Sequence, residues 1–340
     1  MDIKTAIKRV AVFRDLTEKE VYSVFMDIMT GKAAPSQIGA FVTALRMKGE
    51  TVGEIVGAAK AMREKSVKIK FAPEKMIFDT CGTGGSGTNV FNVSTACGFV
   101  LAACGVPMAK HGNKAVSGRC GSADVLKELG VKLDIKPSAV KKCIQKINIG
   151  FLYAPLFHKA MKYAALPRKE IGIRTIFNVL GPLTNPALAR RQVVGVYKEE
   201  LTEKLTKVLK KLGTKRAYVV YGMDSLDEVT ITGKTRITEL SSGRIRSFYV
   251  SPEDFGLKKA AMKDIQGASA KKNAKIIKDI LKGKKGPKRD VVLMNSSVAL
   301  MASGKTKDFK SGVKMAAEAI DTGLALGKLN ALIKITNGAS

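Results

Sequence analysis

Apolar residues recur at helical spacing along about the first 65 residues of the chain. Two segments begin with the capping-box spacing, at Thr17 and at Thr51, and a third opens at Pro35 and stops at Gly49. The apolar positions of the three segments are Val21, Phe25, Ile28 and Met29; Ile38, Phe41, Val42 and Leu45; and Ile55, Ala58, Ala59 and Met62. The pattern predicts three short helices that form a small helical domain.

From about residue 75 onward, short β-rich runs alternate with helical stretches. The runs cover residues 76–78, 193–197, 217–221 and 291–294, and an amphipathic helix from Leu201 to Leu212 lies between the second and the third. Such alternation is typical of a mostly parallel sheet covered by helices. We therefore expect an α/β fold, with an all-helical N-terminal domain over residues 1–70 and a large α/β domain over residues 71–340.

A glycine-rich segment that lacks carboxylates follows the first β-rich run. Residues 80–123 contain no Asp or Glu, although the whole chain has 29 acidic residues. The segment carries nine glycines, beginning with the run Gly-Thr-Gly-Gly-Ser-Gly at residues 82–87. Glycines let backbone N–H groups approach a ligand closely, and missing carboxylates remove repulsion against an anion. The composition predicts a site for a strongly charged phosphate ligand.

Two well-known phosphate motifs fit this segment poorly. Gly82, Gly84 and Gly87 match GxGxxG, but a dinucleotide site needs an acidic residue about 20 positions later, and none occurs before Asp124. A P-loop would need Lys and Ser or Thr after Gly87, where Thr and Asn stand. Residues 89–96 instead predict the start of a small-residue helix that runs to about residue 103, with its N–H groups and hydroxyls facing phosphate oxygens.

Three further segments carry candidate chemistry. Residues 110–118 place two lysines, an amide and a hydroxyl around glycines, which suits a flexible phosphate clamp, and they include one of only two histidines. Arg168 could bind a substrate carboxylate or pair with Glu170, and its position alone does not decide between the two. Asp227 and Glu228 are adjacent acids in a loop after a strand, which suggests Mg²⁺ shared with a phosphate ligand.

Charge and cysteine content narrow the class of protein. The formal charge of +30 fits nucleic-acid binding, attraction of a polyanionic small substrate, or a lysine-rich surface. The densest basic run, residues 282–289, reads as a solvated loop before a strand. Five cysteines without a paired CxxC pattern fit a reduced cytoplasmic protein. No apolar run reaches the roughly 18 residues of a membrane span, so we expect no membrane association.

Taken together and in this order, the segments resemble the anthranilate phosphoribosyltransferase family. The matching stretches are GTGGSG, NVSTA, KHGN, RKEIGIRTIFNVLGPLTNP and LDE. The resemblance covers most of the chain and implies the fold of nucleoside phosphorylase-like phosphoribosyltransferases, with a return of the chain near residues 165–190 to the helical domain. It also implies transfer of phosphoribose from 5-phosphoribosyl 1-pyrophosphate (PRPP) to anthranilate in tryptophan biosynthesis, with Mg²⁺ as cofactor and a homodimer as the assembly.

The resemblance also implies roles for individual residues. The PRPP contacts would be Gly82, Gly85, Ser86, Val90, Asn92, Val93, Ser94, Thr95, Lys110, His111, Gly112, Asn113, Lys114, Ala115, Val116, Ser117, Gly118 and Ser122. The anthranilate contacts would be Gly82, His111, Asn113, Ala154, Pro155 and Arg168. The Mg²⁺ ligands would be Ser94, Asp227 and Glu228. No side chain is implied as a catalytic acid or base, since positioning and electrostatic stabilisation carry such a transfer.

The glycine-rich loop departs from the family at two positions, because members usually have Asp where Ser86 stands and Thr where Val90 stands. Two alternatives therefore stay open. One is a pyrimidine nucleoside phosphorylase, a relative by fold, against which Arg168 and the segment around it argue. The other is a catalytically altered relative that binds nucleic acid through its basic surface, although the anthranilate and metal positions remain and argue against specific nucleic-acid binding.

Overall fold

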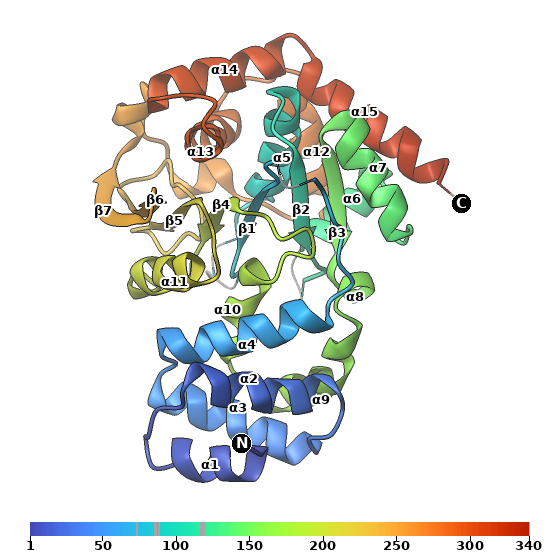
Figure 1. The fold of residues 1–340 in the computed structure, drawn as a ribbon. Coiled ribbons are helices and arrows are strands. Elements are labelled where there is room, and N and C mark those ends of the chain that lie inside the picture. Colours follow the sequence, from blue (N-terminus) through green and yellow to red (C-terminus); the bar gives the residue numbers. More distant parts are fainter. Residues whose placement is uncertain (73, 85–86, 88, 116–119, 340) are drawn as a thin grey trace.

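Four helices at the N-terminus pack into a bundle below the rest of the molecule (Figure 1). In the computed structural model, which describes residues 1–72, 74–84, 87, 89–115 and 120–339, these helices are α1 (Ile3–Val10), α2 (Glu18–Met29), α3 (Pro35–Lys48) and α4 (Val52–Lys65). Capping boxes at Thr17 and Thr51 open α2 and α4, and Gly49 ends α3. The three predicted helices are therefore confirmed, while α1 was not anticipated.

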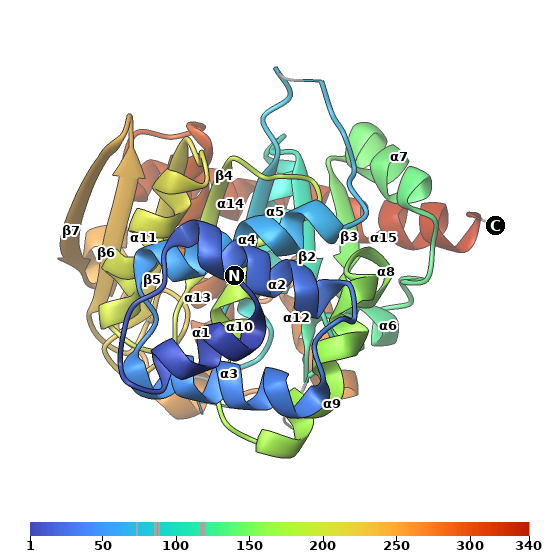
Figure 2. The same cartoon turned by 60° about the horizontal axis from the view of Figure 1, so that its bottom comes forward.

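A later segment of the chain returns to this bundle. Helix α9 (Lys162–Ile171) contacts α2 and α3, and α10 (Ile176–Leu180) contacts α3 and α4 (Figures 1 and 2). The ring of Phe177 lies 5.5 Å from that of Phe25, inside the same buried apolar cluster. The helical part is thus built from two stretches of sequence, and the division of the chain near residue 70 stays a prediction.

A seven-stranded, mostly parallel sheet forms the centre of the upper body. Its order is β3-β2-β1-β4-β5-β6-β7, in which the first five strands are parallel, β6 pairs antiparallel with β5, and β7 pairs antiparallel with β6. The strands are β1 (Phe78–Gly82), β2 (Met108–Gly112), β3 (Ile149–Tyr153), β4 (Arg191–Gly195), β5 (Arg216–Gly222), β6 (Thr235–Ser241) and β7 (Arg244–Val250). The expected mostly parallel sheet is confirmed.

Helices cover both faces of the sheet. Helices α5 (Val93–Ala103) and α13 (Pro287–Ser303) share one apolar core with Phe78, Val193 and Tyr218, and α11 (Glu200–Lys211) packs with Val194 and Val219 of the other face. The remaining helices are α6 (Ser122–Glu128), α7 (Pro137–Ile147), α8 (Ala154–Phe157), α12 (Ala270–Leu281), α14 (Phe309–Asp321) and α15 (Leu324–Asn337). No helix in the described part of the chain is long and apolar enough to cross a membrane.

Two expectations about individual elements are wrong. Residues 291–294 belong to the buried helix α13 rather than to a strand. The basic run at 282–289 is not a solvated loop before a strand, because residues 287–289 begin α13 and Arg289 is buried and pairs with Asp321. Four consecutive apolar residues occur equally in a buried helix and in a strand, so the pattern alone could not separate them. The strand expected at residues 76–78 is β1, which runs from Phe78 to Gly82 and therefore leads directly into the glycine-rich loop.

The helical bundle contains a buried ion pair whose loss we expect to be costly. The fully buried carboxylate of Glu54 accepts hydrogen bonds from the N–H groups of Leu16 and Thr51 and from Lys48 Nζ, at 2.9, 2.7 and 3.0 Å. Glu54→Ala should lower the free energy of unfolding by about 3–5 kcal/mol. The buried Lys48 would lose one of its two acids, and the N–H groups of Leu16 and Thr51 would lose their acceptor. Urea denaturation followed by circular dichroism measures the change.

Glu18→Ala is the matched control. Glu18, like Glu54, lies in the first turn of a helix of this bundle, but its pair with Lys60 is partly exposed to water. Its loss should cost no more than about 1 kcal/mol. Equal costs for the two variants would show that the buried pair contributes nothing beyond an exposed one.

Candidate active site

The carboxyl ends of the five parallel strands meet at one edge of the sheet, on the side of the helical bundle. Gly82 ends β1 and pairs in register with Gly195 at the end of β4, and β2, β3 and β5 end at the same edge. The chain order reverses between β1 and β4, since β2 and β3 extend the sheet on one side and β5 on the other. Ligands of open α/β sheets bind outside the carboxyl ends of the strands at such a point. The glycine-rich loop begins there.

The two acids of the loop after β5 lie against the glycine-rich loop. The Gly84 N–H donates to Asp227 Oδ2 at 3.1 Å, and the Ser94 N–H donates to Glu228 Oε1 at 3.2 Å. A Cβ atom on Gly82 would lie 2.6 Å from Asp227 Oδ2, so glycine is needed for this approach. The structure therefore brings together Gly82, Ser94, Asp227 and Glu228, although about 130 residues of sequence separate the two halves of the group.

A buried lysine adds positive charge beside these carboxylates. Lys110 is 3% exposed, and its Nζ donates to the carbonyl of Thr80 at 2.8 Å and to Ser94 Oγ at 3.3 Å. Burial and the neighbouring Asp227 raise the pKa of Glu228 to about 8, against the opposing effect of Lys110. Burial and the second carboxylate together thus outweigh the stabilising effect of the one lysine on the charged form of Glu228.

Two carboxylates and a hydroxyl are oxygen ligands of the kind that Mg²⁺ prefers. A divalent cation would also favour the charged form of Glu228, whose pKa is raised by burial and by the neighbouring Asp227. Among the described residues no group of three or more His, Cys, Asp or Glu side chains could hold a metal. Two carboxylates and one hydroxyl fit a cation that also takes oxygens from water and from a phosphate ligand.

Helix α5 begins at Val93, later than the predicted start at residue 89, and its cap residue Asn92 links three parts of the chain. Asn92 Nδ2 donates to the carbonyl of Cys120 at 3.0 Å, and Asn92 Oδ1 accepts from Asn273 Nδ2 at 3.2 Å. Two N–H groups of the first turn, those of Val93 and Thr95, already donate to nearby backbone carbonyls. Direct contact of these groups with a phosphate stays a prediction.

The predicted clamp at residues 110–118 is partly a strand rather than a loop. Lys110, His111 and Gly112 form the end of β2, because its parallel pairing with β3 extends to Gly112. Beyond β2, Asp124 Oδ2 accepts from the N–H groups of Ala115 and Gly121 at 3.0 and 2.9 Å, which closes the loop. The remaining loop positions of the expected PRPP set, Val116, Ser117 and Gly118, lie outside the described residues, as do Gly85 and Ser86.

Other members of the expected PRPP set border this loop. Asn113 Oδ1 accepts from the Lys114 N–H at 2.8 Å. A Cβ on Gly112 would overlap Ser122 Oγ, so these two residues touch. Val90 forms an isolated bridge with Gln266, which places the end of the glycine-rich loop against the segment before α12.

The two histidines of the chain form a buried pair at this edge. Their ring centroids lie 5.1 Å apart, and His111 Nδ1 lies 3.2 Å from the carbonyl oxygen of Gly181. Burial lowers the pKa of His111 to about 3 and that of His158 to about 4. Because a carbonyl only accepts, Nδ1 of His111 carries the proton and its Nε2 is an acceptor.

Arg168 lies in the last turn of α9, on the helical side of the site. Its guanidinium stacks over the ring of Phe177, 5.1 Å from the centroid, and burial lowers its pKa. Among the described residues it forms no ion pair, so the alternative pairing with Glu170 is not found. Ala154 and Pro155 begin α8 directly after β3, beside the end of β2 that carries His111.

Sequence reasoning missed several residues that support this edge. Asn295 of α13 and Asn273 of α12 are buried and bond to Val229 and Asn92, next to expected ligands. A Cβ on Gly195 would overlap the carbonyl of Asp227. The only sequence signal for Asn295 is a polar interruption, Asn-Ser-Ser, inside the apolar run at residues 291–300.

Comparisons with known proteins agree with this geometry. The chain matches the helical bundle domain of a glycosyl transferase family over residues 4–66 and the a/b domain of the same family over residues 74–326. It is 53% identical to the anthranilate phosphoribosyltransferase of Geotalea uraniireducens (strain Rf4), over 98% of this chain and 99% of that one. The chain belongs to the anthranilate phosphoribosyltransferase family. The enzyme of Geobacter sulfurreducens is also 53% identical, over 98% of this chain and 99% of its own length.

Solved structures of anthranilate phosphoribosyltransferases have the same fold. The enzyme from Thermus thermophilus superposes with a TM-score of 0.92 at 38% identity, covering 98% of this chain and 99% of that one. The Saccharomyces cerevisiae enzyme in complex with PRPP and Mg superposes with a TM-score of 0.90 at 30% identity, covering 99% and 98%. The expected fold class and family are therefore confirmed.

The buried histidine pair predicts how pH acts on this protein. Since the folded-state pKa values lie near 3 and 4 and the ordinary value is 6.5, the unfolded chain binds more protons below about pH 6.5. The free energy of unfolding should therefore decrease as the pH is lowered below about 6.5. At pH 5.5 the loss should be about 1–1.5 kcal/mol per imidazole. Imidazole NMR signals of the folded protein should stay those of neutral rings from pH 8 to pH 5. Titration of either ring near pH 6.5 would contradict this.

Proposed function

We infer that this protein transfers the phosphoribosyl group of PRPP to the amine of anthranilate. The products are N-(5-phosphoribosyl)anthranilate and pyrophosphate, a step of tryptophan biosynthesis. One observation carries the inference beyond family membership: the glycine-rich loop, Lys110 and the Asp227–Glu228 pair converge at the switch point of the sheet. Such a convergence of N–H donors, a cation and metal-type oxygens suits a diphosphate ligand.

We propose that Mg²⁺ acts with PRPP at the two acids. Ser94, Asp227 and Glu228 would hold the ion, and Lys110, which donates to Ser94 Oγ, would add positive charge beside them. When bound, the ion would neutralise negative charge that develops on the departing pyrophosphate. The complex of the yeast relative with PRPP and Mg supports this assignment. The remaining PRPP contacts expected from the sequence are part of the same proposal.

Anthranilate would bind between the sheet edge and α9. Arg168 has a guanidinium without an ion pair among the described residues, held in place by Phe177, and it would take the anthranilate carboxylate. His111, Asn113, Ala154 and Pro155 would line the approach from the ends of β2 and β3. The yeast relative has also been solved with 4-fluoroanthranilate, which supports an aromatic acid as the acceptor.

The reaction then needs alignment more than acid–base catalysis. The bond between C1 of the ribose and the pyrophosphate oxygen breaks, a bond from C1 to the anthranilate nitrogen forms, and the nitrogen loses one proton. Lys110, buried beside Ser94, would place positive charge near the departing diphosphate. Holding the amine in line with C1 turns a bimolecular step into one within the complex.

Loss of anthranilate fluorescence on mixing the protein with PRPP and Mg²⁺ tests the function directly. We expect turnover that requires all three components. The comparisons support neither alternative, a pyrimidine nucleoside phosphorylase or a nucleic-acid binder, and the charge of +30 would then be a property of the surface. Tight duplex binding at physiological salt without phosphoribosyl transfer would overturn the proposal. A cytoplasmic location stays a prediction.

The role of Arg168 predicts a selective kinetic effect. Arg168→Ala should weaken anthranilate binding by about 1.5–3 kcal/mol, because a charge-assisted pair is lost, and should raise KM for anthranilate far more than KM for PRPP. Steady-state kinetics with each substrate varied in turn measure both constants. Lys169→Ala, at the exposed neighbouring position, is the control and should change neither. Equal increases in both KM values would show that Arg168 has only a structural role.

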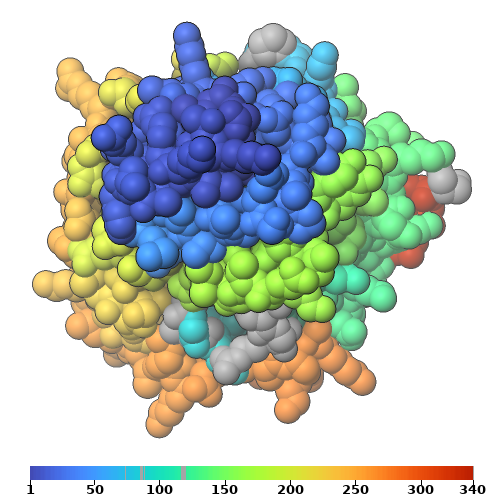
Figure 3. Space-filling view, turned by 90° about the horizontal axis from the view of Figure 1, so that it is seen from below, coloured from blue at the N-terminus to red at the C-terminus, as the bar shows by residue number. Residues whose placement is uncertain are grey.

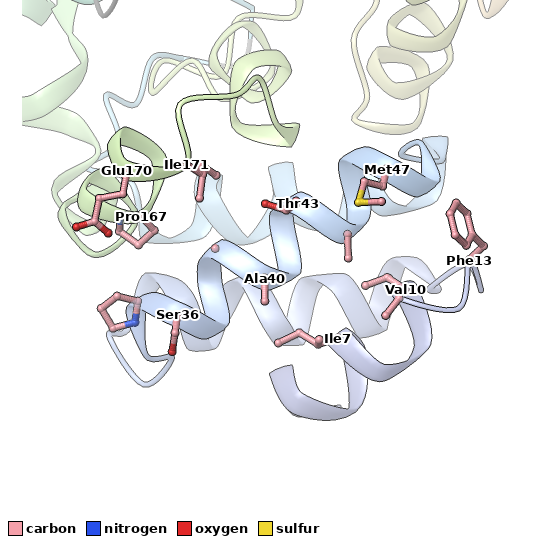
Figure 4. A pocket seen from close by; sticks show the side chains of 14 residues that line it. Ile7, Val10, Phe13, Ser36, Ala40, Thr43, Met47, Pro167, Glu170 and Ile171 are labelled. Carbon is pink, nitrogen blue, oxygen red and sulfur yellow. The ribbon is translucent and has the colours of Figure 1, made fainter.

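The helical bundle offers a surface for the expected homodimer. A groove of about 760 Å³ lies between α1, α3 and α9, with Ile7, Ala40, Met47 and Ile171 among its lining (Figure 4). Met47 and nearby Phe13 are 70% and 64% exposed, unusual for large apolar side chains. Seen from below, α1–α3 (blue) and the yellow-green segment that contains α9 adjoin on one face (Figure 3). We propose that a second copy of the chain covers this face.

A charge placed on this groove should weaken the dimer. Met47→Glu should raise the dimer dissociation constant at least about tenfold, because a carboxylate would be buried against apolar groups, as analytical ultracentrifugation would measure. Leu324→Glu, on an apolar side chain of α15 that is 56% exposed, is the control and should leave the assembly unchanged. A wild-type protein that stays monomeric at micromolar concentration would contradict the proposal.

A further inference from the structure

A buried asparagine of α13 holds the loop that carries the two acids. Asn295 is 4% exposed, its Oδ1 accepts from the Val229 N–H at 2.8 Å, and its Nδ2 donates to the Val229 carbonyl at 2.8 Å. Nδ2 also donates to the carbonyl of Val291, one turn earlier in the same helix, at 2.8 Å. The amide therefore pairs with both backbone groups of the residue that follows Glu228, as a neighbouring strand would.

The other side of the acid pair rests on β4. A side chain at Gly195 would overlap the carbonyl oxygen of Asp227, so the two backbones touch at the end of the strand. The Gly195 carbonyl in turn accepts from the Thr83 N–H at 2.9 Å, at the start of the glycine-rich loop. The acids are thus held between β4 on one side and Asn295 of α13 on the other.

This constraint matters because the path of the loop backbone sets where the two acids point. The carboxylates of Asp227 and Glu228 accept hydrogen bonds from the N–H groups of Gly84 and Ser94, at 3.1 and 3.2 Å, and these contacts require the loop to approach the glycine-rich segment closely. Residues 223–230 form no regular element. Asp224 accepts from the Leu226 N–H and the Thr230 hydroxyl within the loop, and Asn295 adds a contact from another part of the chain. Asn295 fixes Val229, and with it the direction in which Glu228 faces Ser94.

We propose that Asn295 is a positioning residue for the metal site: by pairing with Val229 it keeps Asp227 and Glu228 aimed at the glycine-rich loop. It touches neither metal nor substrate, so its loss acts on affinity for the cation and for the PRPP–metal complex. The inference rests on the proposed function, because it assigns the orientation of the ligands proposed there for Mg²⁺. A merely structural Asn295 would affect stability alone.

Two variants test the role of Asn295. Asn295→Ala removes all three hydrogen bonds. Asn295→Ser retains folding more readily, because a serine hydroxyl can bond to the Val291 carbonyl one turn earlier, yet it is too short to reach Val229. Ser297→Ala is the matched control: Ser297 is fully buried two residues along the same helix, and its Oγ donates to the carbonyl of Phe309 at 2.7 Å, away from the acids.

The measurements are Mn²⁺ binding in the presence of PRPP, by electron paramagnetic resonance, and the Mg²⁺ concentration that gives half-maximal activity. Both Asn295 variants should weaken Mn²⁺ binding at least tenfold and raise the Mg²⁺ requirement by a similar factor, with a smaller change in kcat at saturating Mg²⁺. Ser297→Ala should lower the melting temperature and change neither metal measurement.

The outcomes separate the two levels of the proposal. If the folded Asn295 variants bind Mn²⁺ as the wild type does, or if Ser297→Ala weakens binding equally, the positioning role is wrong while the proposed function stands. If the wild-type protein binds no Mn²⁺ with PRPP present, the metal assignment in the proposed function fails, and the positioning role fails with it.

Discussion

The close approach of two backbones, at Gly195 and Asp227, is the constraint on which the active-site region depends. It brings the loop after β5 to the ends of β1 and β4, so that Asp227 and Glu228 reach the N–H groups of Gly84 and Ser94. A parallel sheet makes this possible, since all its carboxyl ends open on one edge. The charges at that edge are then balanced only in part by Lys110.

Much of this arrangement could be predicted from the sequence, because the informative signals were local. Capping boxes at Thr17 and Thr51 and the stop at Gly49 determine three helices through contacts within a few residues. Glycines and missing acids mark residues 80–123 as an anion site without knowledge of the fold. Asp227 and Glu228 are adjacent in the sequence, so the sequence alone also identifies them as a pair.

What could not be predicted depends on contacts distant in sequence. Asn295 acts 66 positions away from Val229, and nothing in its own neighbourhood distinguishes it from a packed polar residue. His158 meets His111 only because α8 follows β3 and β3 pairs with β2. The sequence also cannot separate a strand from a helix at residues 291–294, because burial on all sides of α13 hides the helical period.

The return of α9 and α10 to the N-terminal bundle affects the order in which the chain can fold during its synthesis. Phe177 packs against Phe25, and Ile176 and Leu180 belong to the same buried cluster, so the core of the bundle is incomplete without them. A ribosome releases the N-terminus first, yet this core cannot close until about residue 180 has emerged. By then β1, β2 and β3 have already left the tunnel, so the N-terminal bundle, although first in sequence, closes only when part of the second body is already present.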